Sequence, residues 1–360
     1  MRAAIMRGHS IVVDEMPDPE PLSGQVLVKT LACGICGSDL HALKHLDKMV
    51  ASTAGRGPLG QVRPERDLVM GHEYCAEILD YGPDCSRRPK PGTRVCSYPM
   101  LAGPQGRQAI GYSNVVPGGY GEFMLLNEEL LLPVPEGLPT AYAALTEPMA
   151  VGWHAVQMAR MDKADVPLVV GCGPVGLAVI AALKLSGAGP IVAADFSPRR
   201  RSLAAALGAD VVVDPGAASP YESWREAAEL PPDPDSGAGL FAVPGPRYRP
   251  AVIFECVGVP GVLDQIMAQS PRGARIVVVG VCMESDTIMP IYGINKELNL
   301  QFVLAYTPQE FALSLRHLAE GRIDAEAMLT GSVGLDGVAG AFDALASPEQ
   351  HCKIMVTPWN

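Results

Sequence analysis

The stretch that decides the fold is Pro167-Leu168-Val169-Val170-Gly171-Cys172-Gly173-Pro174-Val175-Gly176-Leu177. Its apolar run predicts a strand, its glycines a tight turn, and its end the start of a helix. Gly171 permits the turn, Gly173 lets a pyrophosphate approach the backbone, and Gly176 lets helix and strand pack closely. Amide groups and the positive dipole end at the start of the helix favour phosphate. The stretch therefore predicts a dinucleotide site lined by Gly171, Gly173, Pro174, Val175 and Gly176.

An acidic residue follows the next strand at the separation that such a site needs. Residues 191–194 are apolar and lead into Asp195, about 20 residues beyond the glycines. Its carboxylate would accept hydrogen bonds from the adenosine ribose and repel a 2′-phosphate, which favours NAD over NADP. The alternative is that Asp195 only caps the following helix. Arg200, within an arginine triplet at 199–201, could instead meet a 2′-phosphate, so NADP stays the second choice.

Strands and helices alternate around this site. Strands are expected near residues 167–170, 191–194, 211–213, 251–254 and 275–279. Such alternation predicts an α/β domain with a doubly wound parallel sheet, a Rossmann coenzyme domain over residues 149–306. The proline-rich residues 231–250 predict a surface loop.

The remainder of the chain has a different pattern. Residues 1–148 contain short apolar runs broken by Gly and Pro, which is typical of a β-rich domain. Residues 307–360 end in a strand of similar composition, so we expect them to complete that first domain.

Composition narrows the classes further. A chain of 360 residues with 48% hydrophobic and 19% charged residues fits two packed domains rather than disorder. A net charge of −11 without a basic stripe argues against nucleic acid. The longest purely apolar run, residues 175–183, is far shorter than the roughly 20 residues of a membrane span. Nine cysteines without a regular frame, and no signal peptide, predict a cytoplasmic protein with reduced thiols.

Three separated segments carry side chains that bind metals. Residues 33–41 include Cys33 and Cys36, residues 71–73 are Gly71-His72-Glu73, and Glu147 precedes a proline. The cysteine pair alone fits a redox dithiol or half a zinc knuckle. A thiolate, an imidazole and a carboxylate together can hold one zinc with an open fourth position, which distinguishes catalytic from structural zinc.

With these segments, the chain resembles the zinc-dependent medium-chain dehydrogenase/reductases over essentially its whole length. The matching motifs are residues 34–41, 71–73, 118–123, 147–148, 171–176, 255–258 and the segment around Lys353. The resemblance implies a GroES-like β-rich catalytic domain beside the Rossmann domain. A glutamate at position 147, where the best-known alcohol dehydrogenases carry a second cysteine, is similar to the sorbitol, threonine and glucose dehydrogenase branch.

The resemblance also implies roles for individual residues. Cys36, His72 and Glu147 would hold one catalytic zinc, and Glu73 would be a ligand or near-ligand that exchanges with water. Ser38 would pass the substrate proton towards solvent, and His41 would carry it further. Asp39 would hydrogen-bond His72 from behind the metal. Additional cofactor contacts would come from Arg200, Cys256, Val257 and Val281.

Two regions depart from the family pattern. Only Cys85 and Cys96 lie within residues 85–112, where the family's structural-zinc lobe has four closely spaced cysteines, so we expect no structural zinc. The interval between His41 and Gly71 is long, and it is either an exposed loop or a lid over the substrate. Residues 105–112 are a candidate pocket wall.

These observations lead to one hypothesis and two alternatives. The hypothesis is a zinc-dependent, NAD-linked dehydrogenase of a secondary alcohol or polyol-like substrate and the matching ketone. The alternatives are a zinc-free enone or quinone reductase of the same superfamily and a non-catalytic binding protein, against which the Ser38 and His41 pair argues. An alternating strand at residues 298–306 could pair across a two-fold axis, which predicts a homodimer or homotetramer.

Overall fold

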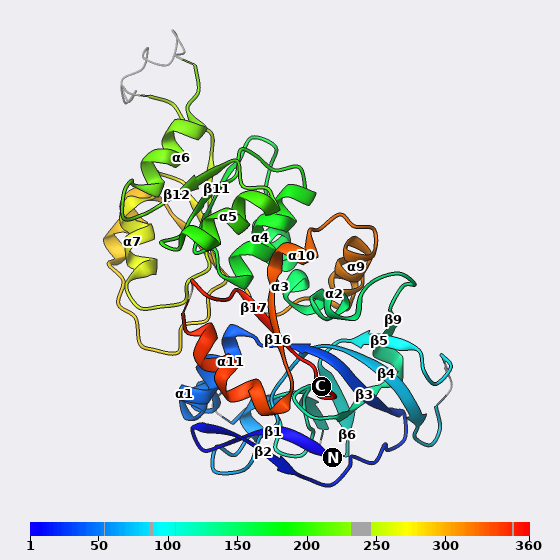
Figure 1. Cartoon of the computed structure of the whole chain (residues 1–360). Coiled ribbons are helices and arrows are strands. Elements are labelled where there is room, and N and C mark those ends of the chain that lie inside the picture. Colours follow the sequence, from blue (N-terminus) through cyan, green and yellow to red (C-terminus); the bar gives the residue numbers. More distant parts are fainter. Residues whose placement is uncertain (54, 86–88, 105, 232–245, 348) are drawn as a thin grey trace. The chain divides into compact units, whose positions relative to one another are not determined.

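The chain forms two compact units in the computed structural model, which describes residues 1–53, 55–85, 89–104, 106–231, 246–347 and 349–360 (Figure 1). Unit 1 comprises Met1–Ala150 and Tyr306–Asn360, and unit 2 comprises Val151–Ala305. The boundaries expected from the sequence were 148/149 and 306/307. Every helix among the described residues is too short or too polar to cross a bilayer.

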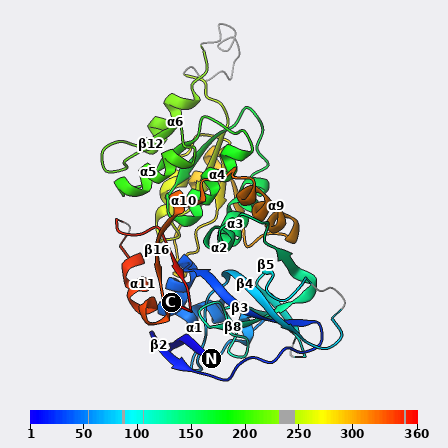
Figure 2. The ribbon, with the colours of Figure 1, turned by 45° about the vertical axis from the view of Figure 1, so that its right-hand side comes forward.

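Unit 1 is built on a seven-stranded sheet in the order β16-β17-β3-β4-β5-β9, with β8 also paired to β3. Its strands are β3 (Gln25–Gly34), β4 (Glu73–Tyr81), β5 (Arg94–Ser97), β8 (Phe123–Asn127), β9 (Leu131–Pro133), β16 (Leu329–Val333) and β17 (Lys353–Val356). The C-terminal strand β17 runs antiparallel to β3, with Met355 opposite Gly34. The red end of the chain thus lies among the blue strands of the N-terminal half (Figure 2).

Smaller elements surround this sheet. They are β1 (Arg2–Arg7), β2 (Ser10–Glu15), α1 (Gly37–Ser52), η1 (Leu59–Gln61), β6 (Met100–Gly103), β7 (Gly106–Ala109), η2 (Glu128–Leu130), α2 (Thr140–Ala144), α9 (Pro308–Ala319), α10 (Ala325–Met328), η3 (Leu335–Gly337) and α11 (Val338–Leu345). Helix α3 (Thr146–Met158) begins in unit 1 and ends in unit 2.

Unit 2 has a six-stranded sheet in which every pair is parallel. The strands are β10 (Val166–Val170), β11 (Val192–Ala194), β12 (Val211–Val213), β13 (Ala251–Glu255), β14 (Arg275–Val278) and β15 (Asn299–Phe302), ordered β12-β11-β10-β13-β14-β15. Numbered along the chain this order is 3-2-1-4-5-6, that of the Rossmann fold, whose ligand crevice lies where the order reverses. The predicted fold class is therefore confirmed.

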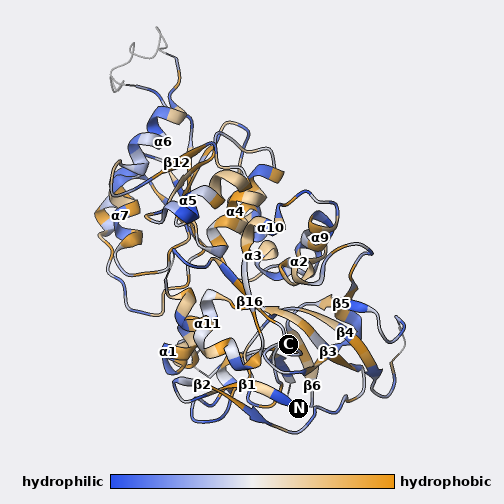
Figure 3. Cartoon of the chain, viewed as in Figure 1, coloured by the Kyte–Doolittle hydropathy of each residue, from blue (hydrophilic) through white to orange (hydrophobic). Residues whose placement is uncertain are grey.

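Helices pack on this parallel sheet. They are α4 (Pro174–Leu185), α5 (Pro198–Leu207), α6 (Pro220–Ala228), α7 (Val262–Gln269) and α8 (Pro290–Lys296). Helix α4 is hydrophobic over most of its length (Figure 3), and its residues from Gly176 to Leu183 are buried. Parallel sheets need such cover on both faces.

Two sequence expectations are corrected by the structure. Residues 42–52, expected as part of a loop or lid, continue α1, which is kinked at His45. Ala42, Leu46 and Met49 are buried at helical spacing, so burial of one face makes this segment helical. The strand expected at 298–306 ends at Phe302, and Ala305 has a positive φ of 56°, which no strand accommodates. Most of the proline-rich loop, residues 232–245, lies outside the described residues.

Candidate metal and cofactor sites

Three of the predicted metal-binding side chains meet in unit 1. One ligand atom each from Cys36, His72 and Glu73 lies within 4.8 Å of the other two. Cys36 caps the start of α1, and Glu73 opens β4 opposite Gly34 at the end of β3. A side-chain carbon at position 34 would come 2.1 Å from a Glu73 carboxylate oxygen, so the observed position of that carboxylate requires glycine there. The antiparallel pair β3–β4 thus joins residues about forty positions apart.

Glu147 lies beside this cluster rather than inside it. It opens α3 and is buried, but its carboxylate does not join the group whose atoms lie within 4.8 Å. Burial raises the pKa of Glu147 to about 7, and the Glu73 charge adds to this rise, while His72 opposes it. The charges of His72 and Glu73 therefore affect the pKa of Glu147, although its carboxylate lies outside the group of atoms within 4.8 Å of one another.

The Glu73 carboxylate is held by a lysine. Lys353 Nζ lies 2.7 Å from both carboxylate oxygens of Glu73 and donates a third hydrogen bond to the carbonyl of Ile35 at 3.0 Å. Both charged side chains are fully buried. The Glu73 charge raises the pKa of Lys353 although burial alone would lower it. Sequence reasoning noted the Lys353 segment but assigned it no role; a single lysine within the apolar strand β17 was the available signal, since buried lysines are almost always paired.

Asp39 lies behind His72. Its Oδ1 is 3.5 Å from His72 Nδ1, and its Oδ2 accepts hydrogen bonds from the Tyr120 hydroxyl at 2.6 Å and the Cys36 amide at 3.0 Å. Burial alone would raise the pKa of Asp39, but His72 and these hydrogen bonds outweigh it and lower the pKa. Asp39 thus faces the histidine nitrogen from the position expected of a residue that orients a metal ligand.

Ser38 and His41 follow on the first turns of α1. Ser38 is half-buried, and its oxygen lies 2.9 Å from the hydroxyl of Tyr112, which is also 3.0 Å from Asp39 Oδ1. Tyr112 and Tyr120 were not predicted as site residues, although Tyr112 ends the candidate pocket wall 105–112. Tyr120 lies in the family motif at residues 118–123, but nothing local shows that either tyrosine contacts Asp39, because that partner is distant in the sequence.

The donor set fits a zinc ion. Burial raises the pKa of the Cys36 thiol, and the Glu73 charge adds to this rise, so a thiolate here needs a cation beside it. His72 turns Nδ1 towards Asp39, which leaves Nε2 for a metal. A sulfur, a nitrogen and carboxylate oxygens together are the ligands that zinc takes in proteins.

The glycine turn in unit 2 has the backbone of a dinucleotide site. Gly171 has a φ of +91°, and a Cβ at Gly176 would lie 1.9 Å from the Gly171 carbonyl oxygen. Helix α4 starts at Pro174 with Gly173 as its N-cap. A Cβ at Gly173 would meet only the tip of Arg200, 3.9 Å away, so that side of the turn is open.

Asp195 is fixed by backbone amides at the end of β11. Its two carboxylate oxygens each accept a hydrogen bond at 2.8 Å, from the amides of Cys172 and Ser197. Arg200 approaches Asp195 to 3.9 Å, and its buried Nε has no hydrogen-bond partner among the described residues. Asp195, which favours NAD, and Arg200, which could favour NADP, are therefore neighbours.

The other predicted cofactor contacts gather near the same turn. Cys256 donates its amide to the carbonyl of Val170 at 2.9 Å, and a Cβ at Gly171 would lie 2.7 Å from a Val257 methyl group. A Cβ at Gly258 would lie 2.7 Å from the Val281 backbone. These residues lie at the carboxyl ends of β13 and β14, beside the point where strand order reverses.

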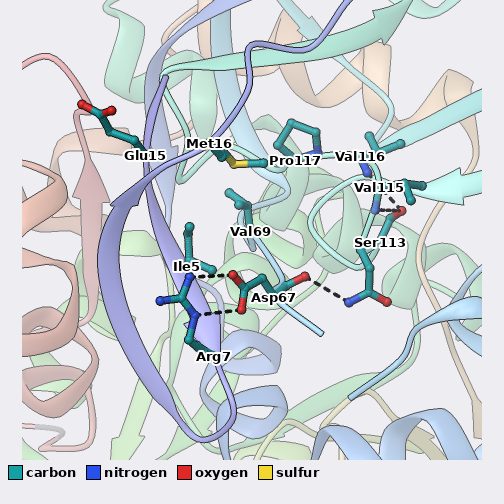
Figure 4. A pocket seen from close by; sticks show the side chains of 11 residues that line it. Ile5, Arg7, Glu15, Met16, Asp67, Val69, Ser113, Val115, Val116 and Pro117 are labelled. Atoms are coloured by element: carbon teal, nitrogen blue, oxygen red, sulfur yellow. Dashed lines mark hydrogen bonds and ion pairs between the residues drawn. The ribbon is translucent and has the colours of Figure 1, made fainter. Parts of the chain in front are cut away.

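A separate small pocket of unit 1 has a volume of about 130 Å³ (Figure 4). It lies between β1 and residues 113–117, and its wall includes the ion pair of Arg7 with Asp67 at 2.6 Å. The described residues that line it include none of the predicted metal ligands, so it is not the candidate site.

Both units match known protein families. Residues 22–136 match the family model of the alcohol dehydrogenase GroES-like domain, and residues 174–320 match that of zinc-binding dehydrogenases. The (R,R)-butanediol dehydrogenase of Bacillus subtilis is 32% identical over 370 residues, covering 99% of this chain and 100% of that protein. Sorbitol dehydrogenase of the same organism is 26% identical and covers 99% of this chain and 97% of its own.

One solved structure adds a bound cofactor. A protein of Sinorhizobium meliloti 1021, assigned as a zinc-binding dehydrogenase and bound to NADP, is 25% identical with a TM-score of 0.77, and the match covers 99% of each chain.

Proposed function

Because the chain belongs to the zinc-dependent alcohol dehydrogenase family, we propose that it transfers hydride between NAD and a secondary alcohol or polyol-like substrate, with the matching ketone as the other reactant. The observation that carries this proposal is the cluster of half-buried Cys36 with buried His72 and Glu73. The butanediol and sorbitol dehydrogenases among its relatives support a small substrate with more than one oxygen.

Zinc at this cluster would polarise the substrate oxygen, and NAD would accept the hydride. Cys36 and His72 would hold one catalytic zinc, with a carboxylate as the third ligand. Lys353 already balances the charge of Glu73, so the Cys36 thiolate and Glu147 would supply the two negative charges that match Zn²⁺. We therefore assign Glu147 as the third ligand and Glu73 as the neighbour that exchanges with water. No structural zinc is proposed.

Ser38 and His41 would move the substrate proton. Ser38 is half-buried at the start of α1, where its hydroxyl can accept the proton of a substrate hydroxyl and pass its own proton on. His41 lies one helical turn further on and would carry the proton on towards solvent. Asp39 would hold the His72 ring in place.

NAD is the proposed cofactor. Its pyrophosphate would lie at the turn from Gly171 to Gly176, and its adenosine ribose would meet Asp195. Arg200 lies beside that acid and would favour NADP, and one similar solved structure is bound to NADP, so the comparison of the two cofactors is a direct test.

We also propose a homo-oligomer, either a dimer or a tetramer. Strand β15 is the last strand of the sheet of unit 2; Phe302 at its end is 64% exposed, and Leu304, two residues beyond it, is 86% exposed. An apolar sheet edge of this kind pairs readily with a second copy. Light scattering after size exclusion would distinguish monomer, dimer and tetramer.

The nine free cysteines support a cytoplasmic location.

The metal assignment is tested by Cys36→Ser and Glu147→Ala as separate variants. Each is expected to lose zinc, measured by elemental analysis, together with turnover of alcohols. Cys85→Ser and the exposed Glu129→Ala are matched controls that are expected to keep both. If both site variants retain full metal and turnover, the zinc assignment is wrong, and zinc-free wild-type protein would favour the reductase alternative.

The substrate class is tested by a panel of secondary alcohols, polyols and sugars, with cofactor reduction followed by absorbance. Turnover of vicinal diols or polyols with NAD is the expected result. A clear preference for NADP would refute the proposal that Asp195 binds the adenosine ribose and repels a 2′-phosphate. Absence of turnover across the panel in protein that holds zinc and NAD would favour the non-catalytic alternative.

A further inference from the structure

Tyr306 carries a buried hydroxyl that has no partner. The residue is 6% exposed, and its hydroxyl oxygen forms no hydrogen bond among the described residues. Burying an unpaired hydroxyl is costly, so native proteins keep few such groups, and each one calls for an explanation. A buried donor of this kind indicates an acceptor that comes within reach when the site is filled.

Packing holds the rest of Tyr306 in place. Its ring stacks on that of Phe311 with centroids 5.4 Å apart and meets the Tyr98 ring edge-on at 5.2 Å. The Tyr98 hydroxyl donates to the Tyr306 carbonyl at 3.3 Å. The next residue, Thr307, forms a capping box with Glu310 at the start of α9. The unpaired hydroxyl is therefore not the tip of a loose side chain.

The start of α3, with Glu147, lies beside this aromatic group. Helix α2, which ends shortly before Glu147, packs against α9. One strand contacts both sides, because the Cys96 thiol of β5 donates to the Ala143 carbonyl at 3.2 Å and Tyr98, directly after β5, reaches Tyr306. Burial raises the pKa of Tyr306, and the charge of the neighbouring Glu147 carboxylate adds to this rise.

The Tyr306 hydroxyl acts on Glu147 in return. Burial raises the pKa of Glu147, whereas His72 and the Tyr306 hydroxyl oppose that rise. A donor lowers the pKa of a carboxyl group by stabilising its ionised form. The hydroxyl therefore favours the form of Glu147 that a zinc ion requires.

We propose that Tyr306 is a positioning residue, whose hydroxyl donates to the Glu147 carboxylate oxygen that does not bind zinc. A carboxylate that binds a metal through one oxygen keeps free lone pairs on the other, and in a buried site that oxygen needs a donor. The hydrogen bond fixes the rotation of the carboxylate and directs its other oxygen to the metal. This inference rests on the proposed function, in which Glu147 is the third zinc ligand.

Tyr306→Phe removes the hydroxyl and keeps the ring on Phe311. Zinc affinity, measured by competition with a chelator of known affinity, is expected to fall about 10- to 100-fold, the usual effect of losing a partner of a metal ligand. Tyr98→Phe is the matched control, since it removes a hydroxyl from the same aromatic group, and its zinc affinity is expected to stay within about twofold of the wild type. An equal loss in both variants would show that packing is responsible and would overturn the inference.

A double-mutant cycle with Glu147→Cys tests whether Tyr306 acts through the carboxylate. A thiolate can bind zinc, but it leaves no second oxygen for the hydroxyl. In the Glu147→Cys background, Tyr306→Phe is therefore expected to change zinc affinity by less than about twofold. The same loss with and without the carboxylate would overturn the inference.

Failure of the inference and failure of the proposed function are distinguishable. If Glu147→Ala loses zinc while Tyr306→Phe binds it as tightly as the wild type, the inference is overturned and the ligand assignment stands. If Glu147→Ala keeps full zinc affinity, the ligand assignment fails, and the inference fails with it.

A crystal structure of the zinc-loaded wild type tests the same point without any variant that has to fold. The Tyr306 hydroxyl oxygen is expected about 2.5–2.7 Å from the Glu147 oxygen that does not bind the metal, the length of a charge-assisted hydrogen bond. A separation above about 3.5 Å from both carboxylate oxygens would overturn the inference.

Discussion

Replacing Lys353 with methionine is expected to lower the free energy of unfolding of the zinc-free protein by about 3–5 kcal/mol. Lys353 is fully buried, and its ammonium group contacts both carboxylate oxygens of Glu73 at 2.7 Å and the Ile35 carbonyl at 3.0 Å. Methionine retains most of the apolar stem, so packing changes little. The loss arises because Glu73 is left buried without its counterion, which costs far more than an exposed ion pair is worth.

The measurement is urea unfolding near neutral pH in the presence of a chelator, so that zinc cannot replace the lysine. The exposed Lys90→Met is the matched control and is expected to change stability by less than about 0.5 kcal/mol. Adding Glu73→Gln to Lys353→Met removes the stranded charge and is expected to restore a large part of the loss. A loss below about 1 kcal/mol for Lys353→Met, the range of surface pairs, would refute this reasoning.

Three further changes have expected outcomes. Burial raises the pKa of Glu147 from 4.5 to about 7. Between these two pH values the folded zinc-free protein holds a proton that the unfolded chain has already released. The free energy of unfolding should therefore fall by about 3 kcal/mol as the pH rises from 4.5 to about 7 and then level off. Glu147→Gln should flatten this profile in urea unfolding, and an unchanged profile would contradict it. Gly176→Ala places a Cβ 1.9 Å from the Gly171 oxygen. NADH binding, measured by fluorescence, should weaken about tenfold or more while the zinc content stays unchanged. Wild-type affinity in this variant would contradict close packing between Gly176 and Gly171. Trp224→Phe removes the hydrogen bond to Val166 at 2.9 Å and should cost about 1–3 kcal/mol by calorimetry; no shift would mean that this contact is not stabilising.

The corrections show where local patterns are ambiguous. Residues 42–52 were expected as part of a loop or lid because the interval between His41 and Gly71 is long. Their helical spacing of Ala42, Leu46 and Met49 was present in the sequence, but it has meaning only when a surface exists to bury that face. The strand at 298–306 shows the reverse case, since alternation continues in the sequence after the backbone has left the sheet at Phe302.

The sequence by itself determined the glycine turn and its acid. Gly171, Gly176 and Asp195 report on a strand–turn–helix unit whose parts are close in the chain, so spacing alone specifies the contacts. It also supplied the residue types of the metal cluster, Cys36 and His72, through motifs that are each only a few residues long.

Only the tertiary structure decided that Lys353 and Tyr112 support that cluster. Lys353 is 280 residues from Glu73, and Tyr112 is 74 residues from Ser38. The first pair forms because β17 adds to β3, and the second because Gly111 packs on Gly71. A lone lysine in an apolar strand signals that Lys353 needs a partner, but the sequence names neither that partner nor the one of Tyr112. Each partner depends on how distant strands and turns pack, and a buried charge or hydroxyl is satisfied by whatever that packing brings within hydrogen-bonding distance.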